Sequence, residues 1–147
     1  MGQIQDVFAK AAKAELWAGN LITGRSDSGK KLENRTPIDN SLIGYIADGE
    51  AADIDAAVAV ARNSFNSGEW SDLSPAERKA VMQRWAKLME DNIEELAALD
   101  CIDAGKPISE CLNTDLPATI ETFHWYAEAA DKVFGKVAPT GSSALGL

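Results

Sequence analysis

Three residues of this sequence have side chains suited to nucleophilic chemistry: Cys101, Cys111 and the sole histidine, His124. An imidazole beside a thiol can remove the thiol proton, and the thiolate can then attack a carbonyl carbon. The alternative is that both cysteines are small packing residues, since buried cysteines are usually inert. We favour packing for that reason. A single histidine also excludes a metal site built from several histidines.

The standard motifs of cofactor and metal sites are absent. The chain has no Gly-x-Gly-x-x-Gly, no complete Gly-x-x-x-x-Gly-Lys-Ser/Thr phosphate loop, no His-Glu-x-x-His and no Cys-x-x-Cys. The sequence therefore assigns no catalytic residue and no cofactor-binding residue.

Acidic side chains and tryptophans are the remaining candidates for a binding site. Four carboxylates lie close together in the sequence, but charges on helices are mostly solvated, so only Asp103 is kept as a possible cation ligand. The tryptophans could form a binding platform, although their helical spacing among aliphatic residues favours core packing. The carboxylates are Glu94, Glu95, Asp100 and Asp103, and the tryptophans are Trp17, Trp70, Trp85 and Trp125.

Charge and composition exclude several classes of partner. The 147 residues carry a net charge of −9 and no basic stripe, so the surface repels nucleic acids and anionic membranes. No apolar run approaches the roughly 20 residues that span a bilayer, and the N-terminus does not resemble a signal peptide. Two cysteines suit a reducing compartment. We expect a cytoplasmic protein that binds neither nucleic acid nor membrane.

Hydrophobic periodicity and capping residues predict the elements that must position any site. Residues 1–147 read as one partial domain of the α+β class, mainly helical, with a small antiparallel β element and a Gly- and Ser-rich tail over 137–147. The predicted strands are Asn20–Ile22, Lys31–Arg35 and Leu42–Ala47, with a turn-rich stretch at Gly24–Gly29. The predicted helices cover Gln3–Leu16, then Asp53 to Gly68, Ser74 onwards, Asn92 to Gly105, and Leu112 to Gly135.

Capping chemistry supports three of these helix starts. Ser74 can accept from the amide of Glu77, whose carboxylate can reach back, and Pro75 suits a first turn. Asp53 is expected to cap its helix, and Asn92 is expected to repeat the same logic. Pro117 should mark the first turn of the last helix or a kink in it.

The order of these segments resembles the N-terminal part of aldehyde dehydrogenases, over Leu21 to Pro139. The most recognisable piece is Asp103-x-Gly105-Lys106-Pro107, and the order and spacing of the pieces make the resemblance specific. The other pieces are Leu21-Ile22-Thr23-Gly24, Asp53–Val58, Gly68-Glu69-Trp70, Glu94–Ala97 and Trp125–Glu128. Details such as Leu116-Pro117 and Val137–Thr140 look most like the γ-glutamyl-γ-aminobutyraldehyde dehydrogenases of polyamine breakdown.

This resemblance implies the N-terminal part of a Rossmann-like cofactor domain in an enzyme that oxidises an aldehyde with NAD or NADP. In such enzymes the cofactor turn, the nucleophilic cysteine and the general-base glutamate come later in the chain. Cys101 and Cys111 do not match the nucleophile. The 147 residues alone are therefore expected to bind no cofactor and to be inactive.

The resemblance also implies two sites. Asp103 would help bind a sodium or potassium ion together with backbone carbonyls near Asn34 and Arg35; the alternative is that Asp103 only ends its helix. Thr114, Asp115 and Ala118 would line the substrate entrance, with Asp115 holding the distant amine of an amino-aldehyde. The alternative for Asp115 is that it supports the N-terminal end of its helix.

Two other readings of the whole chain remain open at this point. It could be a non-catalytic helical interaction module, or a complete small enzyme that uses Cys111 or His124, which we favour least. As partners we expect the remainder of the enzyme chain, or self-association through apolar helix faces, as in a homo-oligomer.

Overall fold

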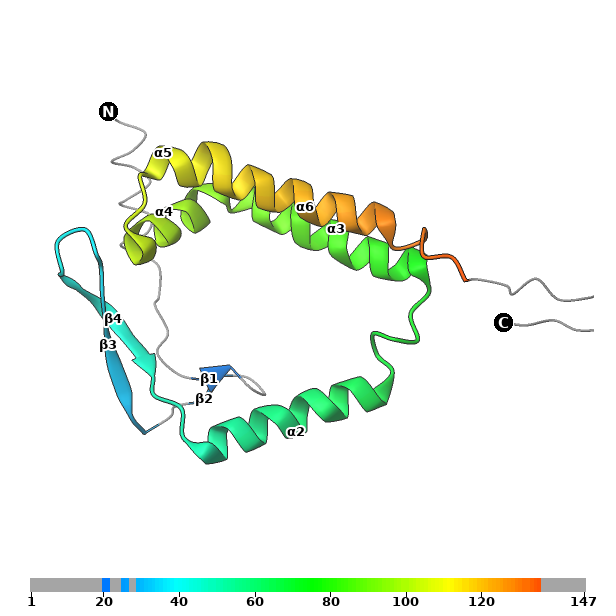
Figure 1. Cartoon of the computed structure of the whole chain (residues 1–147), viewed down its shortest axis with the longest axis horizontal. Helices are drawn as coiled ribbons and strands as arrows, with labels where there is room; N and C mark the ends of the chain where they lie inside the picture. Colours follow the sequence, from blue (N-terminus) through cyan, green and yellow to red (C-terminus); the bar gives the residue numbers. More distant parts are fainter. Residues whose placement is uncertain (1–19, 22–24, 27–28, 136–147) are drawn as a thin grey trace, which may run out of the picture.

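The computed structural model describes residues 20–21, 25–26 and 29–135, in which two short antiparallel hairpins precede a set of helices (Figure 1). The strands are β1 (Asn20–Leu21), β2 (Arg25–Ser26), β3 (Lys31–Arg35) and β4 (Leu42–Ala47). The helices are α2 (Ala51–Ser67), α3 (Pro75–Asp91), α4 (Ile93–Ala104), α5 (Ile108–Glu110), the π-helical turn η1 (Cys111–Asp115) and α6 (Leu116–Ala129). The predicted class, mainly helical α+β, is confirmed. The predicted helix Gln3–Leu16, Trp17 and the tail 137–147 lie outside the described residues.

The β3–β4 hairpin has the bounds that the sequence predicts. Its strands pair antiparallel from Lys31 opposite Ala47 to Arg35 opposite Leu42, with a register shift after Asn34. Asn40 adopts φ 63° in the connecting turn, a conformation that asparagine tolerates better than most residues.

The first hairpin corrects one expectation. β1 pairs with β2, and β2 lies inside the stretch Gly24–Gly29 that we expected to be only a turn. A two-residue strand has no alternation of apolar and polar residues, so periodicity cannot find it.

Helix α2 begins two residues earlier than predicted. Glu50 is the N-cap, and Asp53 is the third helical residue, whose carboxylate accepts a hydrogen bond from the Glu50 amide at 2.8 Å. The prediction that Asp53 is the N-cap residue is therefore wrong, because Asp53 is already helical and its carboxylate accepts from the amide of the actual cap. Gly68, with φ 75°, ends the helix as predicted.

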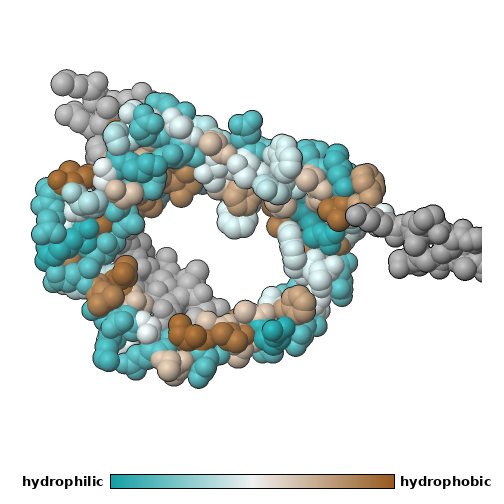
Figure 2. Space-filling view, in the orientation of Figure 1, coloured by the Kyte–Doolittle hydropathy of each residue, from teal (hydrophilic) through white to brown (hydrophobic). Residues whose placement is uncertain are grey.

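The apolar stripe of α2 is exposed in the part of the chain that the structure describes. No side chain of α2 is buried, and Ile54, Val58 and Phe65 are 60%, 62% and 70% exposed. The described elements surround an open centre, and Figure 2 shows apolar colour along the side of α2 that faces it. The stripe has the spacing of a core face without the core.

Helices α3 and α6 lie side by side and run antiparallel (Figure 1). The capping box of α3 is confirmed: the Glu77 amide donates to Ser74 Oγ, and Glu77 Oε2 accepts from the Ser74 amide at 2.8 Å. Across the pair, Lys79 Nζ lies 2.7 Å from Glu128 Oε2. The rings of Trp85 and Phe123 pack with their centroids 4.8 Å apart.

The prediction that the tryptophans pack in a core is wrong for the three that the structure describes. Trp70, Trp85 and Trp125 are each about half exposed or more. Their helical spacing is that of a buried face, but the surface that would bury them is absent from residues 29–135. A spacing pattern reports which side of a helix is apolar and cannot report whether that side is covered.

The last predicted helix, Leu112 to Gly135, is divided into η1 and α6 and ends early. Leu116 N–H donates to Cys111 O, five residues back, which makes η1 a π-helical turn. Pro117 falls in the first turn of α6, as predicted. The helix then closes at Ala129 with tighter turns, in which Ala130 N donates to Ala127 O. The prediction that this helix continues to Gly135 is therefore wrong. Asn92 is the N-cap residue of α4, as predicted, but its side chain makes no cap hydrogen bond there and donates to Leu88 O instead.

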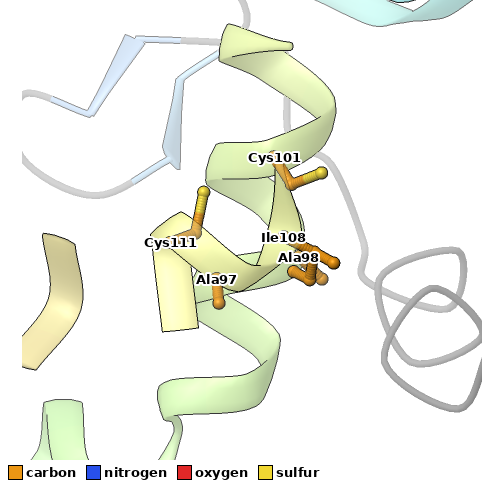
Figure 3. Close-up of a cluster of buried hydrophobic side chains, with 5 residues drawn as sticks. All are labelled: Ala97, Ala98, Cys101, Ile108 and Cys111. Carbon is orange, nitrogen blue, oxygen red and sulfur yellow. The ribbon is translucent and has the colours of Figure 1, made fainter. Parts of the chain in front are cut away.

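The described core is small and lies where α4, α5 and η1 meet (Figure 3). Its buried residues are Ala97, Ala98, Cys101, Ile108 and Cys111. Gly105 ends α4 in the left-handed conformation, φ 71°, and a Cβ built on it would lie 2.6 Å from Pro37 Cγ. Glycine is therefore required twice at this position, by its dihedral angle and by the hairpin packed against it.

Gly105→Ala should destabilise the chain by at least about 1–2 kcal/mol, the cost of a left-handed non-glycine residue, with the overlap on Pro37 adding to it. Guanidinium unfolding followed by circular dichroism measures the change. Gly49→Ala is the matched control, because a Cβ there meets nothing within 4 Å. Equal stability losses in both variants would contradict the proposed role of Gly105.

Candidate functional site

Four side chains that can bind charge or protons converge at the start of the last helix. The turn after Gly105 carries Lys106, α4 supplies Asp100, and η1 supplies Cys111 and Asp115. The ligand atoms of Asp100, Cys111 and Asp115 all lie within 4.8 Å of one another. We call these four residues the α6-entry cluster.

Lys106 and Asp115 form the ion pair of this cluster. Their side chains are 44% and 35% exposed, so the pair lies at the surface but is partly desolvated. The hydrogen bond to Asp115 is the main cause that raises the pKa of Lys106, and the charge of Asp100 acts in the same direction. The cluster holds the two carboxyl groups of Asp100 and Asp115 and one lysine amine, so its formal charge is negative.

Cys111 is the neutral member of the cluster. It is completely buried, and burial raises its pKa to about 11, with a hydrogen bond to Asp100 as the next cause. Burial also raises the pKa of Cys101. Both cysteines are free thiols, and Figure 3 shows their sulfur atoms pointing in different directions. The interpretation of both as packing residues is confirmed, because a reactive cysteine needs a lowered pKa and access.

His124 contacts Glu90 and not the α6-entry cluster. Its Nε2 lies 3.3 Å from Glu90 Oε1, and this contact is the main cause that lowers the pKa of Glu90. The pair bridges α6 and α3, away from the buried thiols of α4 and η1. The hypothesis of a thiol activated by His124 is therefore wrong.

The residues expected at the substrate entrance lie together at this end of α6. Thr114 and Ala118 are exposed and four residues apart, and Asp115 between them is half-buried. Asp115 makes no side-chain cap hydrogen bond; its carboxylate turns to Lys106 instead. The alternative, that the charge of Asp115 supports the N-terminal end of its helix, stays a prediction.

Sequence reasoning missed Lys106 as the partner of Asp115. The only signal available was a basic and an acidic residue nine positions apart, on either side of a proline, which matches no helical or strand spacing.

The residues expected at a cation site are partly brought together. Asn34 Nδ2 donates to Asp103 Oδ1 at 2.7 Å, which joins β3 to the end of α4 across 69 residues. The Arg35 guanidinium turns away, to Glu33 Oε2 at 2.7 Å and to Asn40 O at 3.0 Å. Asp103 and the backbone of β3 are therefore neighbours, while the Arg35 side chain serves the hairpin.

Gly24 to Lys30 has the glycine and lysine spacing of a phosphate loop, but Lys31 stands where serine or threonine is required. β2 lies inside the segment and β3 follows it directly, whereas a phosphate loop leads from a strand into a helix. Arg25 and Ser26 therefore belong to a strand pair and not to a phosphate loop.

Taken together, the described residues offer charge recognition and no covalent chemistry. The cluster can attract a cation through its carboxylates, and its thiol stays protonated. Among residues 29–135 no helix is long and apolar enough to cross a membrane.

Comparison with known proteins identifies the family. Residues 24–146 match the model of the aldehyde dehydrogenase family. The aminoacetaldehyde dehydrogenase of Pseudomonas aeruginosa is 44% identical over 119 residues, which cover 81% of this chain and 24% of that protein. The NADP/NAD-dependent aldehyde dehydrogenase PuuC of Escherichia coli is 46% identical over 116 residues, covering 79% of this chain and 23% of that protein.

The fold is similar to that of solved members of the family. The crystal structure of a γ-glutamyl-γ-aminobutyraldehyde dehydrogenase from Burkholderia cenocepacia superposes with a TM-score of 0.88 at 40% identity, covering 94% of this chain and 29% of that one. The chain belongs to the aldehyde dehydrogenase family, as its sequence predicts. It spans about a quarter of the length of the curated relatives that it matches.

Cys111 should resist alkylation by iodoacetamide in the folded chain at about pH 8. A pKa of about 11 leaves roughly one thiol in a thousand ionised at that pH, and burial excludes the reagent. Intact-protein mass spectrometry counts the modified cysteines. Both should react once guanidinium unfolds the chain, which is the control; rapid labelling of Cys111 without unfolding would contradict the packing role.

Proposed function

We propose that this chain is the N-terminal part of an enzyme that oxidises an amino-aldehyde or γ-glutamylamino-aldehyde to the carboxylic acid with NAD or NADP. The observation that carries the substrate class is the negatively charged α6-entry cluster, with Asp115 between the exposed residues Thr114 and Ala118. The names of the similar proteins support the same class, since one acts on aminoacetaldehyde and one on a γ-glutamyl-γ-aminobutyraldehyde.

Asp115 suits this role by its charge and its place. A carboxylate at a tunnel mouth attracts the cationic end of a long substrate and leaves the aldehyde end free to reach the reacting centre. Ala118, one turn further on, is small and exposed, so it leaves room for that substrate. Thr114 adds a hydroxyl on the same side of the helix.

The chemistry itself we assign to other parts of the complete enzyme. In residues 29–135 both cysteines are buried with raised pKa values, and no helix follows a glycine-rich phosphate turn. NAD or NADP supplies the hydride acceptor when bound. The role of the present residues is to shape the substrate entrance and to pack against the domain that holds the cofactor.

The apolar stripe of α2 supports this assignment of a partner. Its large side chains are mostly exposed, and contiguous apolar surface marks a face that another surface covers. We propose that the remainder of the enzyme chain covers it, and that without this cover the segment self-associates. We further propose a cytoplasmic enzyme that forms a homo-oligomer, takes part in polyamine breakdown and has no nucleic acid or membrane partner, in keeping with its charge of −9.

Asp103 is the proposed ligand of a sodium or potassium ion in the complete enzyme. It is exposed at the end of α4, and its carboxylate lies beside β3, whose carbonyls at Asn34 and Arg35 would add oxygen ligands. Hard monovalent cations suit such oxygen donors. The 2.7 Å hydrogen bond from Asn34 is the competing explanation, since it ties the hairpin to α4 without any cation.

The complete enzyme should oxidise β-aminopropionaldehyde, and Asp115→Asn should raise its KM several-fold while leaving the KM of butyraldehyde unchanged. The two substrates differ in an ammonium and a methyl group, so only the charged one loses an attraction. NADH or NADPH absorbance measures the rates. Asp131→Asn, at the far end of α6, is the matched control, and the 147-residue chain alone should give no turnover. Equal KM changes for both aldehydes would limit Asp115 to a structural role.

Asp103→Ala should abolish any potassium dependence of the thermal stability of the complete enzyme. Melting is compared in potassium chloride and in choline chloride, because choline is too large for an oxygen cage. Asp55→Ala, an exposed acid on α2, is the control. If the Asn34 contact is the whole role of Asp103, the variant will melt earlier by the same amount in both salts, and the cation proposal fails.

A further inference from the structure

Lys106 is held against Asp115 by the shape of the chain. Gly105 is left-handed, φ 71°, and Pro107 is extended, φ −58° and ψ 132°, so the chain reverses between α4 and α5. This reversal brings the ammonium of Lys106 to a carboxylate nine residues later, at the start of α6. The pair is therefore built into the fold, unlike neighbouring charges on one helix face.

The ammonium of Lys106 occupies the place that a cationic substrate would need. An approaching substrate ammonium meets a carboxylate already bound to a cation, and like charges at close range repel. Both side chains of the pair are partly exposed, 44% for Lys106 and 35% for Asp115, so an incoming group can reach them. Asp100, within 4.8 Å of the Asp115 ligand atom, keeps the cluster negative while Lys106 is present.

We infer that Lys106 is a specificity-determining residue, which competes with the substrate ammonium for Asp115 and so restrains the preference for cationic aldehydes. This inference rests on the proposed function, because it takes Asp115 as the group that holds the substrate amine.

The test removes the charge of Lys106 in the complete enzyme. Lys106→Gln keeps a hydrogen-bond donor for Asp115, and Lys106→Met removes it. If one variant fails to fold, the other still tests the inference. The KM of β-aminopropionaldehyde should fall about fourfold, the effect of one unit charge about 5 Å away when water screens it fully. The KM of butyraldehyde and the kcat of both substrates should not change.

Two controls keep the charge effect separate from others. Lys106→Arg retains the charge and should keep the KM values of the parent enzyme. Lys132→Met removes the same charge near the far end of α6, where Lys132 pairs with Asp131, and should leave both KM values alone. Raising the ionic strength should shrink the effect of Lys106→Gln, because salt screens exposed charges.

The double variant Lys106→Gln/Asp115→Asn shows whether the lower KM for the amino-aldehyde depends on Asp115. If Lys106 competes for Asp115, the gain seen in Lys106→Gln is lost in the double variant. An unchanged or increased KM for the amino-aldehyde in Lys106→Gln and Lys106→Met, while Asp115→Asn still discriminates between the two aldehydes, overturns the inference alone. If Asp115→Asn fails to discriminate, the proposed substrate class fails with it, and the two failures are thereby distinguished.

Discussion

The contact between Gly105 and Pro37 is the constraint on which the arrangement of this chain depends. A Cβ at Gly105 would lie 2.6 Å from Pro37 Cγ, so the β3–β4 hairpin can approach the end of α4 only where the residue has no side chain. The Asn34–Asp103 hydrogen bond reinforces the same junction from the next turn of α4. With the hairpin in place, the chain reverses through Lys106 and Pro107 into η1, and the α6-entry cluster forms.

A small core of short side chains makes this junction tight. Ala97 and Ala98 let α4 approach the α5–η1 segment closely, and Cys111 fills the remaining space. The π-helical turn allows α6 to start with Pro117 in its first turn, where the missing N–H costs nothing. The same packing affects the chemistry of Cys111: burial is the main cause that raises the pKa of its thiol, and the hydrogen bond to Asp100 is the next. Packing and charge therefore act on the same five residues of η1.

The remaining surface has a different logic. α2 buries none of its side chains, and the exposed rings of Trp85 and Trp125 lie on α3 and α6, which pack side by side. A chain that spans about a quarter of its relatives would carry such faces if the rest of the domain covers them. The charged end at α6 and the apolar faces are thus two kinds of surface, one suited to small cations and one to protein.

Local chemistry explains what the sequence by itself determined. The capping box of Ser74 and Glu77, the glycine ends of α2 and α4, and the strands Lys31–Arg35 and Leu42–Ala47 involve residues a few positions apart or a regular alternation. Such patterns are legible because the partners are neighbours in the chain. Even here the predicted cap of α2, Asp53, lies three residues after the actual cap, Glu50, since a carboxylate can serve as the cap or reach back to it.

Only the tertiary structure decided how distant residues meet. The pairing of Lys106 with Asp115 and of Asn34 with Asp103 depends on a chain reversal and on a hairpin packed 69 residues away, which no periodicity encodes. The same holds for the exposure of Ile54 and Trp85, whose spacing indicates an apolar face but not what covers it. Motif order identified the family and the helices that position the entrance. Only the three-dimensional structure shows that Lys106 is the ion-pair partner of Asp115, because an ion pair forms between atoms close in space, whatever their separation in sequence.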